Sequence, residues 1–279
     1  MNTAEFTGVI ALGSFFAGFL GAITGLGGGV VMVPLLALVL GVDIRYAIGA
    51  SLVSVIATSS GAAAAYVKEG FSNVRIGMFL EIATCLGALS GAFLATRLPV
   101  TVIGVIFGVV LLYSAYHSVT AKPEHAPLTS SDRLAVLLKM DSTYPGEGGG
   151  MLSYHVRAVP LGFGLMVVAG ILSGLLGIGS GAIKVIAMDQ AMRIPFKVST
   201  TTSNFMIGVT AAASAGIYLA RGYIDPGLAM PVMLGVLGGS LLGARFLTTA
   251  RTTLLRTIFS AVISILALEM IYYSVSGRL

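Results

Sequence analysis

A lysine stands inside an apolar run of the sequence, three residues after a glycine-rich turn. Lys184 follows Gly177-Ile-Gly-Ser-Gly181 and lies within the run 182–192. A cation among apolar groups is costly unless it is paired or faces a polar cavity, so such a residue indicates a functional site. We predict that Lys184 contacts an anionic substrate. The structural alternatives are a pair with Asp189 or a side chain that extends to a membrane surface.

Two glycine-rich turns provide further groups that suit an anion. Gly25-Leu-Gly-Gly-Gly29 and Gly177-Ile-Gly-Ser-Gly181 each precede a short apolar run. A helix that begins at such a turn presents free backbone N–H groups and the positive end of its dipole, which attract oxyanions. The alternative is that the glycines only allow close helix contact. The substrate-binding residues predicted at these turns are Gly27, Gly28, Gly29, Gly179, Ser180 and Gly181.

Hydroxyl and amide side chains begin the segment that follows each short run. The second half reads Ser199-Thr-Thr-Thr-Ser-Asn204, and hydroxyl residues from Ser51 onward are spaced along the first-half segment. Such groups bind an oxyanion without adding negative charge, although they also form hydrogen bonds between helices. Ser51, Ser203 and Asn204 are the predicted substrate contacts, because Ser51 and Ser203 occupy equivalent positions in an internal repeat.

Other residue patterns argue against an enzyme. The sequence contains no nucleophile–base arrangement, Walker loop or metalloprotease helix motif. Its three histidines are not spaced as metal ligands, and a lone cysteine excludes an intramolecular disulfide. We therefore expect no catalytic residue, no metal and no cofactor. Glu81 and Glu269 lie within apolar segments, where they could carry protons or pair with arginines.

The composition predicts that these groups lie in a membrane protein. Of 279 residues, 56% are hydrophobic and 10% are charged, with a mean hydropathy of +0.98. A soluble domain carries about a quarter charged residues. The net charge of +5 comes from basic residues scattered singly between apolar runs, which argues against a nucleic-acid partner. The predicted partners are the lipid bilayer and a small anion; the oligomeric state stays open.

Ten apolar segments fall into two groups of five, separated by a polar stretch. Residues 1–119 are the predicted first membrane repeat, 158–279 the second, and 120–157 a solvated linker. Ser131-Asp132 could cap one short helix in the linker, with an apolar face of Leu134, Leu137 and Leu138. The ten segments are 6–24, 30–42, 46–67, 75–96, 99–119, 158–177, 182–192, 198–220, 227–248 and 252–275.

The two groups are related by a constant offset of 152 residues, as for Ser51 and Ser203. Duplicated halves are common in secondary transporters. Segments 30–42 and 182–192 are shorter than the roughly 20 residues of a helical span. The predicted fold is therefore all-α, with two repeats of about five segments and broken or re-entrant helices at the glycine-rich turns. The alternative is that the two short segments span the membrane.

The positive charges predict how the repeats are oriented. If the first two segments of each half contribute an even number of crossings, eleven Lys and Arg residues lie on one side and four on the other. A single crossing gives eight against seven. The larger bias fits the positive-inside rule and implies inverted repeats with the linker in the cytoplasm and both termini outside. Inversion would bring the two glycine turns together near the membrane midplane.

The first glycine turn and the residues after it resemble a known family. Gly25-Leu-Gly-Gly-Gly-Val-Val-Met-Val-Pro34 is similar to the glycine turn and Val-Pro step of the TauE/SafE sulfite exporter family, also called the toluene-sulfonate uptake permease group. The second turn departs from this pattern, with Ser180 for the middle glycine and Ile186 in place of the proline. The resemblance implies that the anion is sulfite or an organosulfonate and that it is exported.

These observations predict a secondary transporter in the cell (inner) membrane that works by alternating access around a midplane anion site. The chain shows no ATP-binding motif, so a proton or sodium gradient, or the membrane potential, would drive transport. The alternatives are an anion channel and an uptake permease for another small organic anion. A membrane-embedded enzyme would need a converging acid–base or metal cluster, which the sequence does not show.

Overall fold

The computed structural model describes residues 3–24, 28–68, 72–119, 131–145, 150–247 and 252–277. Within these ranges the protein is almost entirely helical, which confirms the all-α prediction. Each predicted apolar segment coincides with a helical element whose ends lie within a few residues of the predicted ones. The first half contains α1 (Thr3–Thr24), α2 (Gly29–Pro34), the π-helix η1 (Leu35–Val39), α3 (Ile44–Lys68), α4 (Val74–Ala95) and α5 (Val100–Val119).

The second half repeats this order of elements. A π-helical turn follows both short helices, although Ile186 stands where α2 has Pro34, so proline is not required for the turn. The second-half elements are α7 (Val159–Leu176), α8 (Gly181–Ile186), η2 (Ala187–Ala191), α9 (Phe196–Ala220), α10 (Pro226–Leu247) and α11 (Thr252–Val275).

The helix lengths and surfaces are those of a membrane protein. Within the described residues, four helices are long and apolar enough to cross a bilayer: Val74–Ala95, Val159–Leu176, Phe196–Ala220 and Pro226–Gly243. Large apolar side chains lie on outer faces, among them Leu12, Met78 and Leu234, each at least 60% exposed. A soluble protein rarely leaves so many large apolar side chains this exposed to water. The protein is therefore an integral membrane protein.

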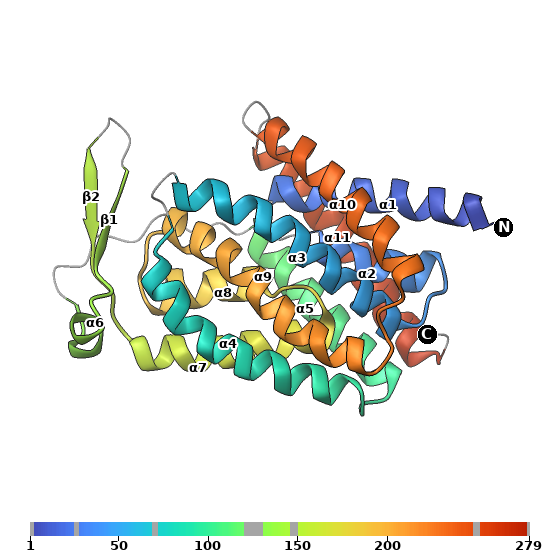
Figure 1. Ribbon diagram of the computed structural model, residues 1–279, viewed down its shortest axis with the longest axis horizontal. Coiled ribbons are helices and arrows are strands. Elements are labelled where there is room, and N and C mark those ends of the chain that lie inside the picture. Colours follow the sequence, from blue (N-terminus) through green and yellow to red (C-terminus); the bar gives the residue numbers. More distant parts are fainter. Residues whose placement is uncertain are drawn as a thin grey trace.

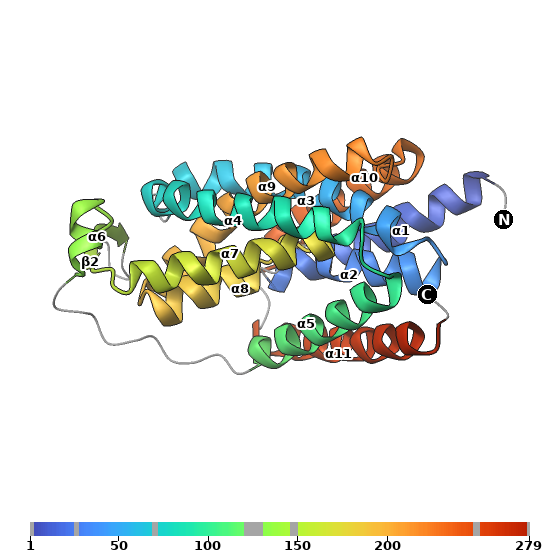
Figure 2. The same ribbon diagram turned by 90° about the horizontal axis from the view of Figure 1, so that it is seen from below.

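Helices from the two halves pair with each other across the bundle. The principal contacts join α1 to α10, α4 to α7, α3 to α9, and α5 to α11; Figure 2 shows α5 lying along α11. With the 152-residue offset, α1 corresponds to α7 and α4 corresponds to α10. The offset therefore exchanges the pair α1–α10 with the pair α7–α4, and it maps each of the pairs α3–α9 and α5–α11 onto itself. The packing thus has the pattern of a two-fold axis between the halves.

The two halves run in opposite directions along the bundle. The start of α1 and the end of α11 lie at one end of the long axis, and the part of the linker that the structure describes lies at the other (Figures 1 and 2). Each half therefore traverses the bundle an odd number of times, as inverted repeats do. The assignment of these ends to the two sides of a membrane stays a prediction.

The described part of the linker, residues 131–145 and 150–157, contains more structure than the sequence predicted. It has the expected short helix, α6 (Arg133–Leu137), and also an antiparallel hairpin of β1 (Ser142–Pro145) and β2 (Met151–Tyr154). The predicted apolar face is wrong, because Leu134 and Leu137 are exposed and Ala135 is the buried residue of α6. The Asp132 carboxylate does not cap α6 but accepts the Ala158 N–H at the start of α7.

Side-chain bonds attach this linker module, residues 131–145 and 150–157, to the start of α4. The Asn73 amide donates to the Met140 carbonyl and the Tyr154 hydroxyl, at 3.1 and 2.7 Å, and Arg75 donates to the Lys139 carbonyl at 2.8 Å. Burial raises the pKa of Tyr154 to about 12, so this hydroxyl stays protonated near neutral pH.

The linker module should loosen in acid through Asp141. Burial opposes ionisation of this carboxyl, but hydrogen bonds from Ser131 and His155 and from the Val156 N–H outweigh it and lower the pKa of Asp141 below its usual value. A lowered folded-state pKa stabilises the module above the unfolded-state value, about 3.9, and this stabilisation disappears as the pH falls through the folded-state value.

Hydrogen exchange of the linker module between pH 6 and pH 3, expressed as protection relative to the intrinsic exchange rate at each pH, measures this effect. Asp141→Asn should remove most of the pH dependence of this protection. Asp225→Asn, in the connection between α9 and α10, should leave it intact. An unchanged pH dependence in Asp141→Asn would assign the effect to another group.

Candidate functional site

The second glycine turn has an unusual backbone conformation between α7 and α8. Gly177, Gly179 and Ser180 all have positive φ, at 68°, 72° and 47°. Glycine adopts this region freely, but a residue with a Cβ does so at a cost of about 1–3 kcal/mol. Ser180 is buried at 3% exposure, and its hydroxyl has no hydrogen-bond partner among the described residues. Strain and an unpaired buried hydroxyl therefore coincide at one residue.

The structure brings the two glycine turns into contact. A Cβ added to Gly29, the first residue of α2, would lie 3.1 Å from the Gly177 carbonyl oxygen and 2.7 Å from the Ser51 hydroxyl. Ser51 Oγ itself donates to the Gly177 carbonyl at 2.8 Å. Gly28, the N-cap of α2, is also buried, whereas Gly27 lies outside the described residues. Only glycine at position 29 allows this approach.

A small cavity, which we call the tip cavity, lies between the two turns and α5. Its polar lining comes from Ser180 and from Ser114, whose hydroxyl donates to the Val110 carbonyl. The space suffices for about one water molecule. The lining residues are Val30, Val110, Ser114, Ile178, Ser180, Gly181 and Ile183.

The predicted hydroxyl contacts lie at the second turn but bind its backbone. Ser203 Oγ donates to the Gly181 carbonyl at 3.2 Å, as Ser51 does to Gly177. One serine comes from each half, so two repeat-equivalent residues hold the same turn. Asn204 is half-buried on α9 and does not line the tip cavity, and Gly179 packs against Ile207.

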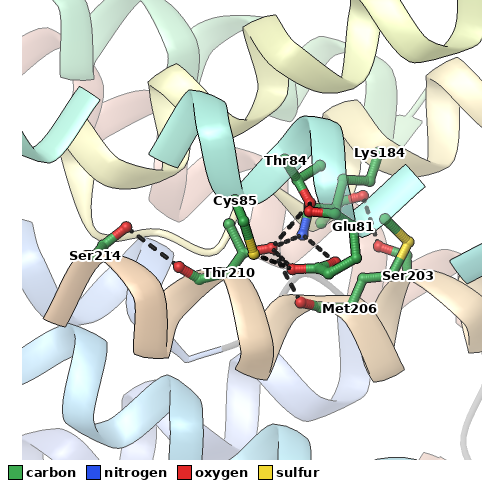
Figure 3. A network of polar contacts seen from close by, with 9 residues as sticks. Glu81, Thr84, Cys85, Lys184, Ser203, Met206, Thr210 and Ser214 are labelled. Atoms are coloured by element: carbon green, nitrogen blue, oxygen red, sulfur yellow. Dashed lines mark hydrogen bonds and ion pairs between the residues drawn. The ribbon is translucent and has the colours of Figure 1, made fainter. Parts of the chain in front are cut away.

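Lys184 is fully buried and points toward α4 and α9, as Figure 3 shows. Its Nζ donates to Thr210 Oγ1 at 2.5 Å and lies 4.0 Å from Glu81 Oε2. The Lys184 side chain therefore contacts residues of two other helices, and it does not line the tip cavity. These two partners do not include Asp189, the alternative partner that the sequence suggested.

Glu81, Thr210 and Lys184 form a compact polar cluster in the core. The Thr210 hydroxyl donates to Glu81 Oε1 at 2.6 Å while it accepts the bond from Lys184. The Cys85 thiol contacts the same carboxylate oxygen at 3.4 Å, and Thr84 Oγ1 lies 3.4 Å from Thr210 Oγ1. Glu81 is 7% exposed. One hydroxyl thus bridges a buried carboxylate and a buried ammonium group.

The sequence did not indicate that these residues form one site. Glu81 was expected to carry protons or to pair with an arginine, Lys184 was expected to contact an anion, and Thr210 was given no role. The charges of the two residues could have indicated the site, because a carboxylate and an ammonium group within apolar segments lower the free-energy cost of burial when they pair. Thr210 carried a second signal, since Thr58 is its repeat equivalent.

These features define a polytopic helical membrane protein whose inverted halves meet at paired glycine turns. The chain belongs to the sulfite exporter TauE/SafE family, which matches residues 10–270. Two relatives are the probable membrane transporter proteins YunE and YdhB of Bacillus subtilis (strain 168). YunE is 27% identical over 275 residues, 96% of this chain and 98% of YunE. YdhB is 28% identical over 239 residues, 85% of this chain and 89% of YdhB.

A more distant relative is the probable membrane transporter protein ORF9 of Sinorhizobium sp, which is 22% identical over 260 residues, 92% of this chain and 89% of ORF9. No solved structure matches the chain significantly. The family and the names of the relatives support a membrane transporter, but they do not identify the molecule that this protein transports.

Proposed function

We propose that the protein is a secondary transporter that carries sulfite or an organosulfonate across the inner membrane, with export as its physiological direction. The observation that carries this proposal is the junction of the two glycine turns around the tip cavity, where the buried Ser180 hydroxyl has no partner among the described residues. The family description supports a sulfur oxyanion as the substrate.

The chemistry of the junction suits a tetrahedral or pyramidal oxyanion. The first N–H groups of α8 have no acceptor within their helix, so with the Ser180 hydroxyl they offer several donors to one ligand. The described residues that line the cavity include no carboxylate that would repel an anion. The donors thus suit a small oxyanion by hydrogen bonding, without a covalent step.

Transport would require the cavity to enlarge. Space for about one water molecule does not hold a sulfite ion, so in the proposed alternating-access cycle this conformation would be a closed state. The inverted halves would move against each other and open the junction to one side at a time. The positive-inside bias supports a cytoplasmic linker and termini on the opposite side.

Uptake into proteoliposomes of sulfite, thiosulfate, sulfate and alkylsulfonates tests the proposal. We expect saturable flux of a sulfur oxyanion, and Ser180→Ala should lower it strongly, because it removes the buried hydroxyl without adding a larger side chain at a residue of positive φ. Ser90→Ala is the matched control, because Ser90 is exposed on α4 and its hydroxyl donates to the Leu86 carbonyl of its own helix. A protein that transports none of these anions would contradict the substrate assignment.

The test also separates the two alternatives. A channel would pass the anion only down its electrochemical gradient, whereas a transporter would concentrate it when a coupling-ion gradient is imposed. An uptake permease for another organic anion would respond to carboxylates and not to the sulfur compounds.

A further inference from the structure

We propose that Glu81 is a proton-binding site that competes with the substrate anion for Lys184, so that one proton moves with each anion. This inference rests on the proposed function and names its coupling ion. In the closed state Glu81 acts as an internal anion for Lys184, through Thr210. When a proton from water binds Glu81 Oε2, the carboxylate loses its charge and Lys184 becomes free to bind the substrate.

The geometry of the carboxylate leaves one oxygen ready for a proton. Glu81 Oε1 accepts the Thr210 hydroxyl at 2.6 Å and contacts the Cys85 thiol. Glu81 Oε2 is buried and has no hydrogen-bond partner among the described residues, and its closest charged neighbour is Lys184 Nζ at 4.0 Å. A buried charged oxygen with no donor is costly, and protonation removes that cost.

Among the residues that the structure describes, Lys184 is the charged group that lies beside Glu81. The thiol of Cys85 and the hydroxyls of Thr84 and Thr210 complete the surroundings. Helix α7, which packs along α4, has no ionisable residue. The ionisable residues of α9, Lys197 and Tyr218, are 13 and 8 positions from Thr210, roughly 20 and 12 Å along the helix. The charge of this cluster therefore depends on Glu81 and Lys184.

The other half of the protein lacks this charged pair. With the 152-residue offset, Glu81 corresponds to Met233 and Lys184 to Met32. Thr210 corresponds to Thr58, whose hydroxyl bonds to carbonyls of its own helix. Methionines therefore occupy the corresponding positions in a bundle that otherwise packs symmetrically. A pair needed only to join helices would be expected in both halves, so its presence in one half indicates a specialised role.

Lys184 connects this charge to the glycine turn. It lies on α8 one helical turn after Ser180, about 6 Å along the axis, and its N–H bonds to the Ser180 carbonyl. Its long flexible side chain can leave Glu81 without unwinding α8. The same short helix thus carries a cation restrained by Glu81 and the hydroxyl that lines the tip cavity.

Because the anion can bind Lys184 only when a proton has neutralised Glu81, the proton and the anion cross the membrane in the same direction. Binding a monovalent anion together with one proton leaves the net charge of the site unchanged, so the transported pair is electrically neutral. The cycle is reversible, and the sum of the proton and anion gradients sets its direction. Export of an accumulated anion would therefore carry protons out with it.

Calorimetric titration in two buffers of different ionisation enthalpy tests the inference, because it counts the protons taken up with each anion. Methanesulfonate and thiosulfate are suitable probes, since they stay fully ionised near neutral pH. For the wild-type protein we expect about one proton per anion. We also expect the dissociation constant to rise about tenfold per pH unit where Glu81 is ionised.

Glu81→Gln imitates the protonated carboxyl and should bind the anion without proton uptake or pH dependence. Glu269→Gln is the matched control, because Glu269 is an exposed residue of α11, and it should behave as the wild type. The wild-type proton count does not depend on whether the Glu81→Gln variant folds. Anion binding without proton uptake in the wild type would overturn the inference and leave the proposed function standing. Failure of every sulfur anion to bind would overturn the proposed function and this inference with it.

Discussion

Lys184→Met alone is expected to lower the free energy of unfolding by about 3–5 kcal/mol, because it leaves the Glu81 carboxylate buried without its counter-charge. Glu81→Met should have a cost of similar size by stranding the ammonium group of Lys184. The double variant Glu81→Met, Lys184→Met should recover most of this loss, since a buried ion pair replaced by well-packed apolar residues is often neutral or stabilising. It also gives this half the methionines that the other half has at Met233 and Met32.

Equilibrium unfolding in mixed micelles at neutral pH measures the three variants as a double-mutant cycle. Glu269→Met serves as the control and should change stability by less than about 0.5 kcal/mol, because its side chain is exposed. Additive losses in the double variant would show that Glu81 and Lys184 do not interact. We further expect the double variant to fold but to lose anion transport, which separates the structural contribution of the pair from its role in binding.

The helices of this protein could be predicted because membrane helices are apolar along their length. The expected segment 75–96 agrees with α4 (Val74–Ala95), and the expected short segment 182–192 agrees with α8 and η2 together. The predicted inversion of the halves also implied the contact between the turns, since equivalent elements that lie close to a two-fold axis meet each other. Gly29 and Gly177 accordingly meet in the core.

The partners of the polar side chains could not be predicted in the same way. The Thr210–Glu81 bond spans 129 residues and depends on the rotation of α4 relative to α9, which an apolar helix does not encode in its periodicity. Ser51 and Ser203 were expected to face an anion, yet they bind the backbone of the second turn. A hydroxyl suits both tasks, and only the local geometry decides between them.

The linker hairpin was not predicted, for a different reason. Its strands, β1 and β2, have four residues each, and five of their eight residues are exposed. Strands this short show no clear alternation of apolar and polar residues, which is the main signal for a strand in a sequence. Asn73, outside the linker, supplies bonds that attach the hairpin region to the bundle.

Close packing between the halves explains many of the glycines that lie outside the turns. A Cβ at Gly87 of α4 would overlap the Val167 carbonyl of α7, and one at its repeat equivalent, Gly239 of α10, would overlap the Phe15 carbonyl of α1. The two contacts are equivalent, because the internal repeat exchanges the pair α4–α7 with the pair α10–α1. Close helix packing therefore accounts for these glycines of the paired helices, while anion binding at the glycine turns stays a proposal.

Gly87→Ala and Gly239→Ala are therefore expected to destabilise the fold by about 3 kcal/mol each, because a backbone carbonyl cannot move aside as the end of a side chain can. Gly164→Ala is the matched control: Gly164 is also helical, on α7, and a Cβ there meets no atom within 4 Å. It should stabilise the protein by about 0.5–1 kcal/mol through the lower backbone entropy of the unfolded chain. The opposite signs make unfolding midpoints a sharp test. Equal shifts for all three variants would show that the close contacts between the halves do not limit the size of these residues.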